Sequence, residues 1–355
     1  MEKRIIFTGG GTAGHVMVNV AIIPEFIKDG WTVDYIGSKA GIERELISSI
    51  DQVTYHPIST GKLRRYFSKE NFKDPFKVLK GTMQAHRIIG QKKPAVIFSK
   101  GGFVSVPVLI AARMRGIPAV IHESDFTPGL ANKIAIPFAK KVLATFPETT
   151  KYLPEKKAKW IGAVVRDELF TGEQKRGYQI TGFNRGKNVL LIMGGSAGSK
   201  RMNQAVREGL DQLLRQFQII HICGKDNIDE SIKQEGYVQY EYVQDELKDL
   251  LAISDIVCSR AGANAIFEFL ALHKPMLLIP LSRHASRGDQ IVNAESFEKQ
   301  GYAKVLEEED LTTESLVEAL GNIRKDKMAI KEQMNQYRSS EAKQSVIDII
   351  QQTAK

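Results

Sequence analysis

Residues 4–15 read RIIFTGGGTAGH, and residues 188–200 read NVLLIMGGSAGSK. Each stretch joins an apolar run of strand length to a glycine-rich loop, and a helical pattern follows. A Rossmann-like domain opens in this way, because its first strand delivers a phosphate-binding loop to the start of a helix. The weak repeat therefore predicts two Rossmann-like domains in one chain.

Further apolar runs alternate with helical patterns after each of these openings. They lie at 32–36, 95–99, 118–122 and 141–145 in the first half, and at 218–223, 237–243, 255–258 and 276–280 in the second. Such alternation is typical of a parallel sheet covered by helices. We therefore expect an α/β fold with two Rossmann-like domains facing a cleft.

A polar stretch at 160–187 separates the two patterns. We expect an N-terminal domain over 1–163 and a C-terminal domain over 164–340. A helix at 341–355 follows, and the sequence leaves its docking place open. The length of 355 residues fits two domains of roughly 150 residues each.

The composition is that of a globular protein. Hydrophobic residues make up 43% and charged residues 26%, which excludes a disordered, collagen-like or coiled-coil chain. Cys223 and Cys258 have apolar, strand-like neighbours, so we expect buried thiols in a reducing compartment. The N-terminus lacks a signal-peptide pattern, and the apolar stretch near 103–112 is shorter than the roughly 18–20 residues that span a bilayer. We expect a cytoplasmic protein that does not cross a membrane.

The positive charge is concentrated in the first half of the chain. The net charge is +9, with +12 in residues 1–165 and −3 in residues 166–355. In the segment 62–80, KLRRYFSKENFKDPFKVLK, basic residues interleave with aromatic ones. This pattern suits an anionic membrane surface and, equally, a plain solvated loop, and RNA binding is a further alternative.

The first glycine loop contains G-x-G-x-x-G at residues 9–14. Its amides and the following helix N-terminus can hold a phosphate, although a plain tight turn is the structural alternative. Asp34 stands where a dinucleotide fold places its ribose-binding acid, so an NAD-dependent oxidoreductase is an alternative function. His15 ends the loop and is a candidate base or ligand contact.

The second glycine loop differs from a Walker A loop, because Ser199 stands where a glycine must precede the lysine. Its amides and the Ser196 hydroxyl can still bind a diphosphate. Arg166, near the domain boundary, could add a bidentate contact to the same diphosphate or lie in solvent.

Two further motifs follow strands of the second half. In SRAGANAIFE, at 259–268, the small residues around Ala263 and Asn264 let amides approach a ligand, and Glu268 could accept from ribose hydroxyls. In RGDQ, at 287–290, Asp289 and Gln290 could bind sugar hydroxyls, because residues beyond a parallel strand line the ligand crevice. Helix capping is the alternative for both motifs.

Glu123 and Asp125 follow the strand at 118–122 and are candidates to take a proton from an acceptor hydroxyl. No Asp-x-Asp cluster suited to a sugar-nucleotide metal is present. We therefore expect neither a metal nor a cofactor, and a diphosphate would be held by amides, Arg166 and helix dipoles.

Six motifs together resemble the MurG family of N-acetylglucosaminyltransferases. They are GGGTAGH, SKGGFVS, HESDFTPGLANK, GGSAGSK, SRAGANAIFE and RGDQIVNA, in this order across residues 4–305. The resemblance implies the glycosyltransferase B architecture, with UDP-GlcNAc bound by the C-terminal domain and lipid I by the N-terminal one. It also implies a peripheral protein at the cytoplasmic face of the plasma membrane, with no nucleic acid partner.

The resemblance also assigns residue roles. It implies diphosphate contacts from Arg166 and Ser196, a ribose contact from Glu268, a donor-sugar contact from Gln290, a uracil contact near Val243 and Gln244, and glycine-loop contacts from Thr12, Ala13 and Gly14. His15 falls on the candidate base. The chain departs from the family at Ala13, where glycine is frequent, and at Asp125, where asparagine is frequent.

The reaction implied is an inverting transfer. The C4 hydroxyl of the muramoyl sugar of lipid I would attack C1 of UDP-GlcNAc, giving a β-1,4 link, lipid II and UDP. His15 is the first candidate for the base, followed by Asp125 and Glu123. A glycolipid synthase acting on diacylglycerol, the NAD-dependent oxidoreductase and a non-enzymatic membrane adaptor remain as alternatives.

Overall fold

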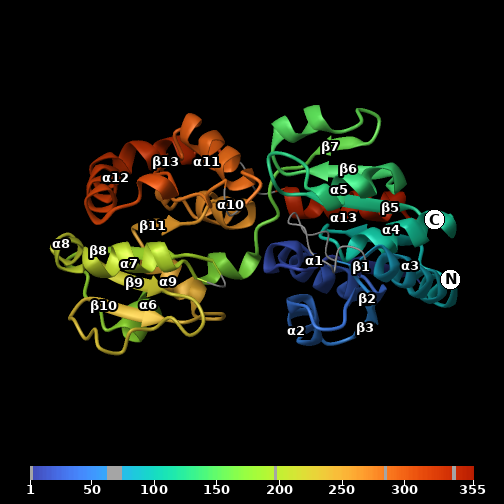
Figure 1. Cartoon of the computed structure of the whole chain (residues 1–355), viewed down its shortest axis with the longest axis horizontal. Helices are drawn as coiled ribbons and strands as arrows, with labels where there is room; N and C mark the ends of the chain where they lie inside the picture. The colour runs from blue at the N-terminus through green and yellow to red at the C-terminus, as the bar shows by residue number, and fades with distance from the viewer. Residues whose placement is uncertain (1–2, 62–73, 196–197, 284–285, 338–340) are drawn as a thin grey trace. The chain divides into compact units, whose positions relative to one another are not determined.

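The computed structural model describes residues 3–61, 74–195, 198–283, 286–337 and 341–355. The chain forms two compact units (Figure 1). Unit 1 comprises Met1–Val165 with Ser339–Lys355, and unit 2 comprises Arg166–Arg338. Each unit has its own parallel sheet, so each is described by itself.

The sheet of unit 1 has seven parallel strands in the order β3-β2-β1-β4-β5-β6-β7. The strands are β1 (Arg4–Thr8), β2 (Thr32–Ser38), β3 (Val53–Ile58), β4 (Val96–Ser99), β5 (Ala119–Glu123), β6 (Lys141–Ala144) and β7 (Ala158–Trp160). The strand order reverses between β1 and β4. Ligands of open α/β sheets bind outside the carboxyl ends of the strands at such a point.

Helices cover both faces of this sheet. They are α1 (Met17–Lys28), α2 (Ile42–Ser48), α3 (Asp74–Lys92), α4 (Ser105–Met114), α5 (Leu130–Ala135) and α13 (Ala342–Thr353), with short 3-10 helices at Ala13–His15, Ile136–Phe138 and Pro147–Tyr152. In α1, Val18, Ile22 and Phe26 recur every four residues, so they share one face and pack onto the sheet. The other face of the sheet packs against α3 and α4.

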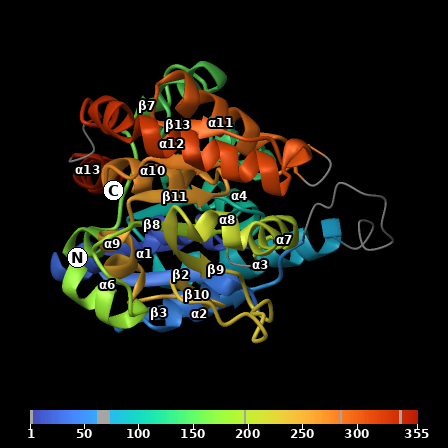
Figure 2. The same ribbon diagram turned by 90° about the vertical axis from the view of Figure 1, so that its left-hand side faces the viewer.

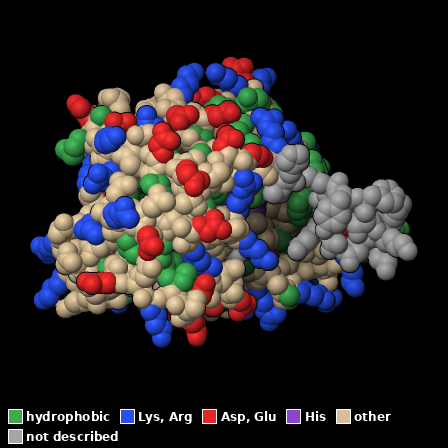
Figure 3. Space-filling view, turned by 60° about the vertical axis from the view of Figure 1, so that its left-hand side comes forward, with side chains coloured by type: hydrophobic (Ala, Val, Ile, Leu, Met, Phe, Trp, Pro, Cys, Tyr) green, Lys and Arg blue, Asp and Glu red, His purple; other side chains and the backbone are tan. Residues whose placement is uncertain are grey.

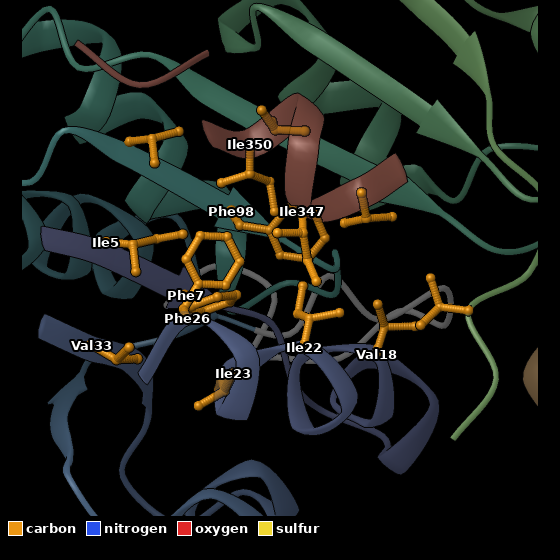
Figure 4. Packing of buried hydrophobic residues seen from close by; sticks show 14 of the residues in the cluster. Ile5, Phe7, Val18, Ile22, Ile23, Phe26, Val33, Phe98, Ile347 and Ile350 are labelled. Atoms are coloured by element: carbon orange, nitrogen blue, oxygen red, sulfur yellow. The ribbon is translucent and has the colours of Figure 1, made fainter. Parts of the chain in front are cut away.

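The last helix, whose docking place the sequence leaves open, belongs to unit 1. Ile347 and Ile350 of α13 point into the same cluster as Phe98 of β4 and Ile22 of α1 (Figure 4). An ion pair of 2.8 Å joins Lys343 Nζ to Glu25 Oε1. The chain therefore leaves unit 1 after its seventh strand and returns to it at the end.

Unit 2 repeats the arrangement with six parallel strands in the order β10-β9-β8-β11-β12-β13. The strands are β8 (Asn188–Met193), β9 (Phe217–Ile222), β10 (Tyr237–Tyr240), β11 (Ile256–Ser259), β12 (Met276–Leu278) and β13 (Ala303–Val305). In Figure 2 they follow one another from β10 at the bottom to β13 at the top. The strand order reverses between β8 and β11, as it does between β1 and β4.

The helices of unit 2 are α6 (Gln174–Thr181), α7 (Lys200–Glu208), α8 (Leu210–Leu214), α9 (Leu247–Ile253), α10 (Ala263–Ala271), α11 (Asp289–Lys299) and α12 (Thr313–Met334), with 3-10 helices at Asp167–Thr171 and Glu308–Asp310. Acidic and basic side chains are interspersed over the face shown in Figure 3.

Both cysteines, Cys223 and Cys258, are buried and form no disulfide.

The predicted α/β fold with two Rossmann-like domains is confirmed. The sequence missed three strands, β3, β7 and β13, all at or next to a sheet edge. Each contains exposed or half-exposed residues, so none forms a continuous apolar run. Among the described residues, no helix is both long and apolar enough to span a membrane.

Candidate active site

Two loops of unit 1 meet at the carboxyl ends of β1 and β4. Gly102 has φ +80°, and a Cβ added there would lie 2.1 Å from the carbonyl oxygen of Gly10. A Cβ on Gly9 would lie 2.4 Å from the carbonyl oxygen of His15. Only glycine permits this close approach of backbone to backbone, which brings the first glycine loop against the loop after β4.

His15 lies at this meeting point. It ends the 3-10 helix Ala13–His15, and its amide donates to the carbonyl oxygen of Thr12 over 3.1 Å. Its ring atom Cδ2 lies 3.2 Å from where a Cβ of Gly102 would stand, so the glycine makes room for the ring. Thr12 and Gly14 are exposed and Ala13 is half-buried, so a ligand can reach this loop.

A buried carboxylate that the sequence analysis missed holds the first glycine loop. Glu43 of α2 is fully buried and accepts hydrogen bonds from the Gly11 amide at 3.1 Å and from the Ser38 amide at 3.0 Å. In sequence it looks like any acid in the first turn of a helix. Its role depends on which loop folds over it, so no local pattern reveals it.

Glu123 anchors the loop after β5. Its Oε1 accepts from the Asp125 amide at 3.0 Å, and its Oε2 accepts from the Gly129 amide and from Asn132 Nδ2, both at 2.9 Å. Burial and then the charge of Asp125 raise the pKa of its carboxyl. Both oxygens are engaged in shaping the loop.

Asp125 lies on the same loop and is half-buried. Thr149 Oγ1 donates to its carbonyl oxygen over 3.1 Å, which fixes its backbone. Of the three predicted bases, Glu123 ends β5, Asp125 lies in the loop that follows, and His15 ends the glycine loop of the same unit.

Asp34, the predicted ribose acid of the oxidoreductase alternative, is fully buried in β2. Its Oδ2 pairs with Arg4 Nη1 at 2.7 Å, and its Oδ1 pairs with His56 Nε2 at 2.6 Å and Lys92 Nζ at 3.2 Å. A carboxylate surrounded by three basic side chains holds the fold together and offers no surface to a ribose. The structure therefore disfavours the oxidoreductase alternative.

In unit 2, Arg166 and Glu268 form a bidentate ion pair. Arg166 Nε donates to Oε1 at 2.8 Å and Nη2 donates to Oε2 at 3.1 Å. Their side chains are 16% and 11% exposed, and Glu168 also lies 3.3 Å from Arg166 Nη1. Two residues 102 positions apart, predicted to bind the diphosphate and the ribose, are thus neighbours.

Glu268 belongs to α10, whose N-terminus lies about one and a half turns before it. No side chain caps the helix, and a Cβ on Gly262 would meet nothing within 4 Å. Asn293 Nδ2 donates to the Ala261 carbonyl oxygen at 3.1 Å and fixes the preceding loop. Ala263 is buried and Asn264 is half-buried, so this first turn can present its backbone to an anion.

Arg260 joins the carboxyl ends of three strands, and the sequence analysis missed it. Its Nη2 donates to Ser199 Oγ at 2.7 Å, and its Nη1 donates to the carbonyl oxygens of Ile279 at 3.1 Å and Pro280 at 3.2 Å. It also pairs with Glu308. The guanidinium therefore positions the loops after β8, β11 and β12 together.

The remaining predicted residues of unit 2 lie at the same sheet edge or near it. Gln290 Oε1 accepts from the Leu281 amide at 3.0 Å, and Asp289 pairs with Arg287 at 3.2 Å. Val243 is buried and Gln244 is exposed in the loop between β10 and α9.

Ser196 lies outside the described residues. Of its neighbours, Gly195 has φ +90° with open space around it, and Gly198 has φ +73° and packs against the Cys223 carbonyl. Within the described part of the chain, no group of His, Cys, Asp and Glu side chains could hold a metal ion.

Two family models match the chain, the glycosyltransferase family 28 N-terminal domain at residues 5–144 and its C-terminal domain at 189–352. Two curated relatives carry the name UDP-N-acetylglucosamine--N-acetylmuramyl-(pentapeptide) pyrophosphoryl-undecaprenol N-acetylglucosamine transferase. The one from Oceanobacillus iheyensis is 63% identical over 100% of this chain and 99% of its own length. The one from Staphylococcus aureus is 55% identical over 97% of both chains.

Solved structures show the same fold. The crystal structure of Acinetobacter baumannii MurG superposes with a TM-score of 0.77 at 24% identity, covering 99% of this chain and all of that one. The glycosyltransferase of kitacinnamycin superposes with a TM-score of 0.78 at 15% identity, covering 100% of both chains.

Proposed function

The chain belongs to glycosyltransferase family 28, and we propose on that basis that it moves N-acetylglucosamine from UDP-GlcNAc to lipid I. The product is lipid II, a precursor of peptidoglycan. The observation that carries the proposal is the full-length identity of 63% to a relative named for this reaction. The reaction is an inverting transfer to the C4 hydroxyl of the muramoyl sugar, and it links the enzyme to cell shape and division.

Unit 2 would bind the donor. The ribose hydroxyls would hydrogen-bond to Glu268, and the diphosphate would bind Arg166, the Ser196 loop and the first-turn amides of α10. Support comes from the distances of 2.8 and 3.1 Å that already join Arg166 to Glu268. The uracil would lie near Val243 and Gln244, with Gln290 and Asp289 on the sugar. These groups stabilise the charge that develops on departing UDP.

Unit 1 would bind the acceptor along the loops after β1, β4 and β5. His15 is the first candidate for the base, because its ring lies where two loops meet and the exposed Thr12 and Gly14 stand beside it. Asp125 is the second candidate. Glu123 fits an anchoring role better, since the loop takes up both of its oxygens.

The choice of base is tested by kinetics. His15→Ala should lower kcat at least about a hundredfold and leave the donor KM unchanged, because general-base catalysis contributes roughly that much. Full turnover in His15→Ala would point to Asp125, and Asp125→Asn is then the variant that should lose kcat.

A surface of unit 1 formed by α3 and α4 would contact an anionic membrane. Phe76, Leu79 and Met83 of α3 are 75%, 59% and 60% exposed, and Met114 of α4 is 64% exposed. Leu79, Met83 and Met114 line a groove of about 600 Å³ whose lining is mainly apolar side chains. Lys77 and Lys80 supply positive charge on the same helix. Residues 62–73 of the predicted membrane segment lie outside the described residues.

Liposome flotation with anionic vesicles tests whether this surface of α3 and α4 binds a membrane. Phe76→Ser with Leu79→Ser should weaken binding to anionic vesicles and spare UDP binding, because the donor contacts lie in unit 2. Met328→Ser, an equally exposed apolar change in unit 2, is the control. Equal loss of vesicle and UDP binding would point to misfolding.

The reaction itself is tested by comparing acceptors and donors. A lipid I analogue should accept N-acetylglucosamine from UDP-GlcNAc, and diacylglycerol or UDP-glucose should react poorly. In a thermal-shift assay UDP should raise the melting temperature, and NAD should not. Preference for diacylglycerol would instead indicate a glycolipid synthase.

A further inference from the structure

A buried lysine lies beneath the loops that would bind the acceptor. Lys100 follows β4 and is 2% exposed. Its amide donates to the Thr8 carbonyl oxygen at the end of β1 over 3.0 Å. Its Cβ lies 3.2 Å from where a Cβ on Gly9 would stand, so the side chain starts directly under the first glycine loop.

The ammonium of Lys100 ends at the loop after β5. Its Nζ donates a hydrogen bond to Ser124 Oγ, and Ser124 is buried as well. The nearby carboxylates are those of Glu123 and Asp125, while burial lowers the pKa of Lys100 to about 8. His122 on β5 also adjoins it, and burial followed by the charge of Lys100 keeps the pKa of that imidazole low.

The two carboxylates near this lysine need a positive charge close by. Glu123 and Asp125 stand two residues apart, and the negative charge of Asp125 raises the pKa of Glu123 after the effect of burial. Two carboxylates this close cannot both ionise cheaply without a nearby cation.

We propose that Lys100 is a positioning residue for the acceptor side of the transfer. Its ammonium ties the loop after β5 to the end of β4 through Ser124 and supplies a positive charge close to Glu123 and Asp125 on the acceptor side. Being buried, Lys100 touches no substrate and acts through Ser124 and Asp125. This role rests on the function proposed above.

A double-mutant cycle tests the proposal. Lys100→Met, Asp125→Asn and the combined variant are compared by kcat/KM for a lipid I analogue. Lys100→Met should lose about tenfold or more, and the effect of Asp125→Asn should change at least about threefold in its presence, as for interacting neighbours. The donor KM should not change. Lys133→Met, an exposed lysine of α5, should behave as the unmodified protein.

The pH profile of kcat/KM and a second variant distinguish a specific effect of Lys100 from misfolding of the Lys100→Met variant. The acid limb of kcat/KM should move to higher pH in Lys100→Met, because the carboxyl of Glu123 loses the positive neighbour that lowers its pKa. Ser124→Ala keeps the ammonium but removes its hydrogen-bond acceptor, and it should also lower kcat without changing the donor KM. Additive effects in the cycle, with an unmoved acid limb, would show that Lys100 does not act through Asp125.

A readout without turnover separates this proposal from the proposed function. The pKa of Lys100 falls from an ordinary 10.5 to about 8 on folding, so the unfolded chain binds more protons between these values and stability rises with pH there. Lys100→Met should show a smaller rise than the unmodified protein, because only the part due to Lys274, whose pKa burial also lowers to about 8, remains. In Asp125→Asn the part due to Lys100 should begin at lower pH. If the chain transfers no sugar, the proposed function fails; if Lys100→Met keeps the full rise, the Lys100 proposal fails.

Discussion

Glu268 has one role in the structure and a second in the proposed reaction. In the structure it neutralises Arg166, and in the proposed reaction it binds the ribose. Glu268→Ala should raise the donor KM roughly tenfold to a hundredfold, because a charge-assisted hydrogen bond contributes roughly 1.5–3 kcal/mol. Steady-state kinetics with varied UDP-GlcNAc measures this.

The matched control for Glu268 is Glu168→Ala. Glu168 also contacts Arg166, but it is 61% exposed, so its loss should change the donor KM little. An unchanged KM in Glu268→Ala would remove Glu268 from the donor site.

Asp34 makes the stability of unit 1 depend on pH. Burial alone would raise the pKa of its carboxyl, but hydrogen bonds from His56, Arg4 and Lys92 hold it below its ordinary value of 3.8. The carboxylate therefore stabilises the fold above about pH 4, and this contribution is lost as the pH falls further. Asp34→Asn should cost about 3 kcal/mol at neutral pH.

Denaturant unfolding at several pH values checks the prediction for Asp34. The difference between Asp34→Asn and the unmodified protein should shrink on acidification, because protonated Asp34 resembles asparagine in charge. Asp51→Asn, an exposed change, should show no such trend. A difference that stays constant from pH 7 to 3 would contradict the linkage.

At the scale of elements, the contact between two glycine-rich loops can be tested directly. Gly102→Ala should destabilise unit 1 by about 2 kcal/mol or more, because φ is +80° and the new methyl meets the Gly10 carbonyl oxygen. Gly11→Ala shares the positive φ, at +88°, but has open space around it, and should cost only about 1 kcal/mol. Thermal unfolding of both variants measures their stabilities, and the difference between them is the cost of the steric clash with the Gly10 carbonyl. Equal losses of stability in the two variants would argue against contact between the loops.

Most of the strands that the sequence predicted are buried, and β10, a half-buried edge strand that it also predicted, is the exception. β1, β4 and β8 are flanked by strands on both sides, so their residues form apolar runs that a strand pattern detects. β7 and β13 lie at sheet edges and contain exposed residues, which leaves no such run. The glycine loops were predictable because glycine itself marks the tight turn.

The polar groups that shape the site were not predictable in the same way. Glu43, Lys100 and Arg260 act by joining loops that are far apart in sequence. Their roles depend on which strands are neighbours in the sheet, and no local spacing carries that information. The sequence singled out Arg166 near the domain boundary and Glu268 in the motif after β11, and the family resemblance supplied their predicted roles, but their mutual contact was not foreseen.

At the scale of the whole molecule, α13 makes unit 1 depend on the end of the chain. Ile350 is fully buried in the cluster that contains Phe7 and Phe98. Ile350→Ala should destabilise unit 1 by about 2–5 kcal/mol through the lost side chain and the cavity it leaves. Calorimetry should show a lower melting temperature for the unfolding of unit 1. The unfolding transition of unit 2, whose melting temperature UDP raises, should not change.

The control for Ile350 lies in unit 2. Ile330→Ala removes a side chain of α12 that is 5% exposed, and it should lower the UDP-sensitive transition instead. If both variants lower the same transition, the two units unfold together.

The return of α13 to unit 1 also constrains how the protein is made. Ribosomes deliver the chain from its N-terminus, so β1 and β4 emerge long before residues 342–353 exist. Until α13 has been synthesised, Ile5, Phe7 and Phe98 lack the helix that packs against them, and their apolar side chains are exposed. Unit 2 is complete before unit 1 is, so the nascent protein is a natural client of chaperones.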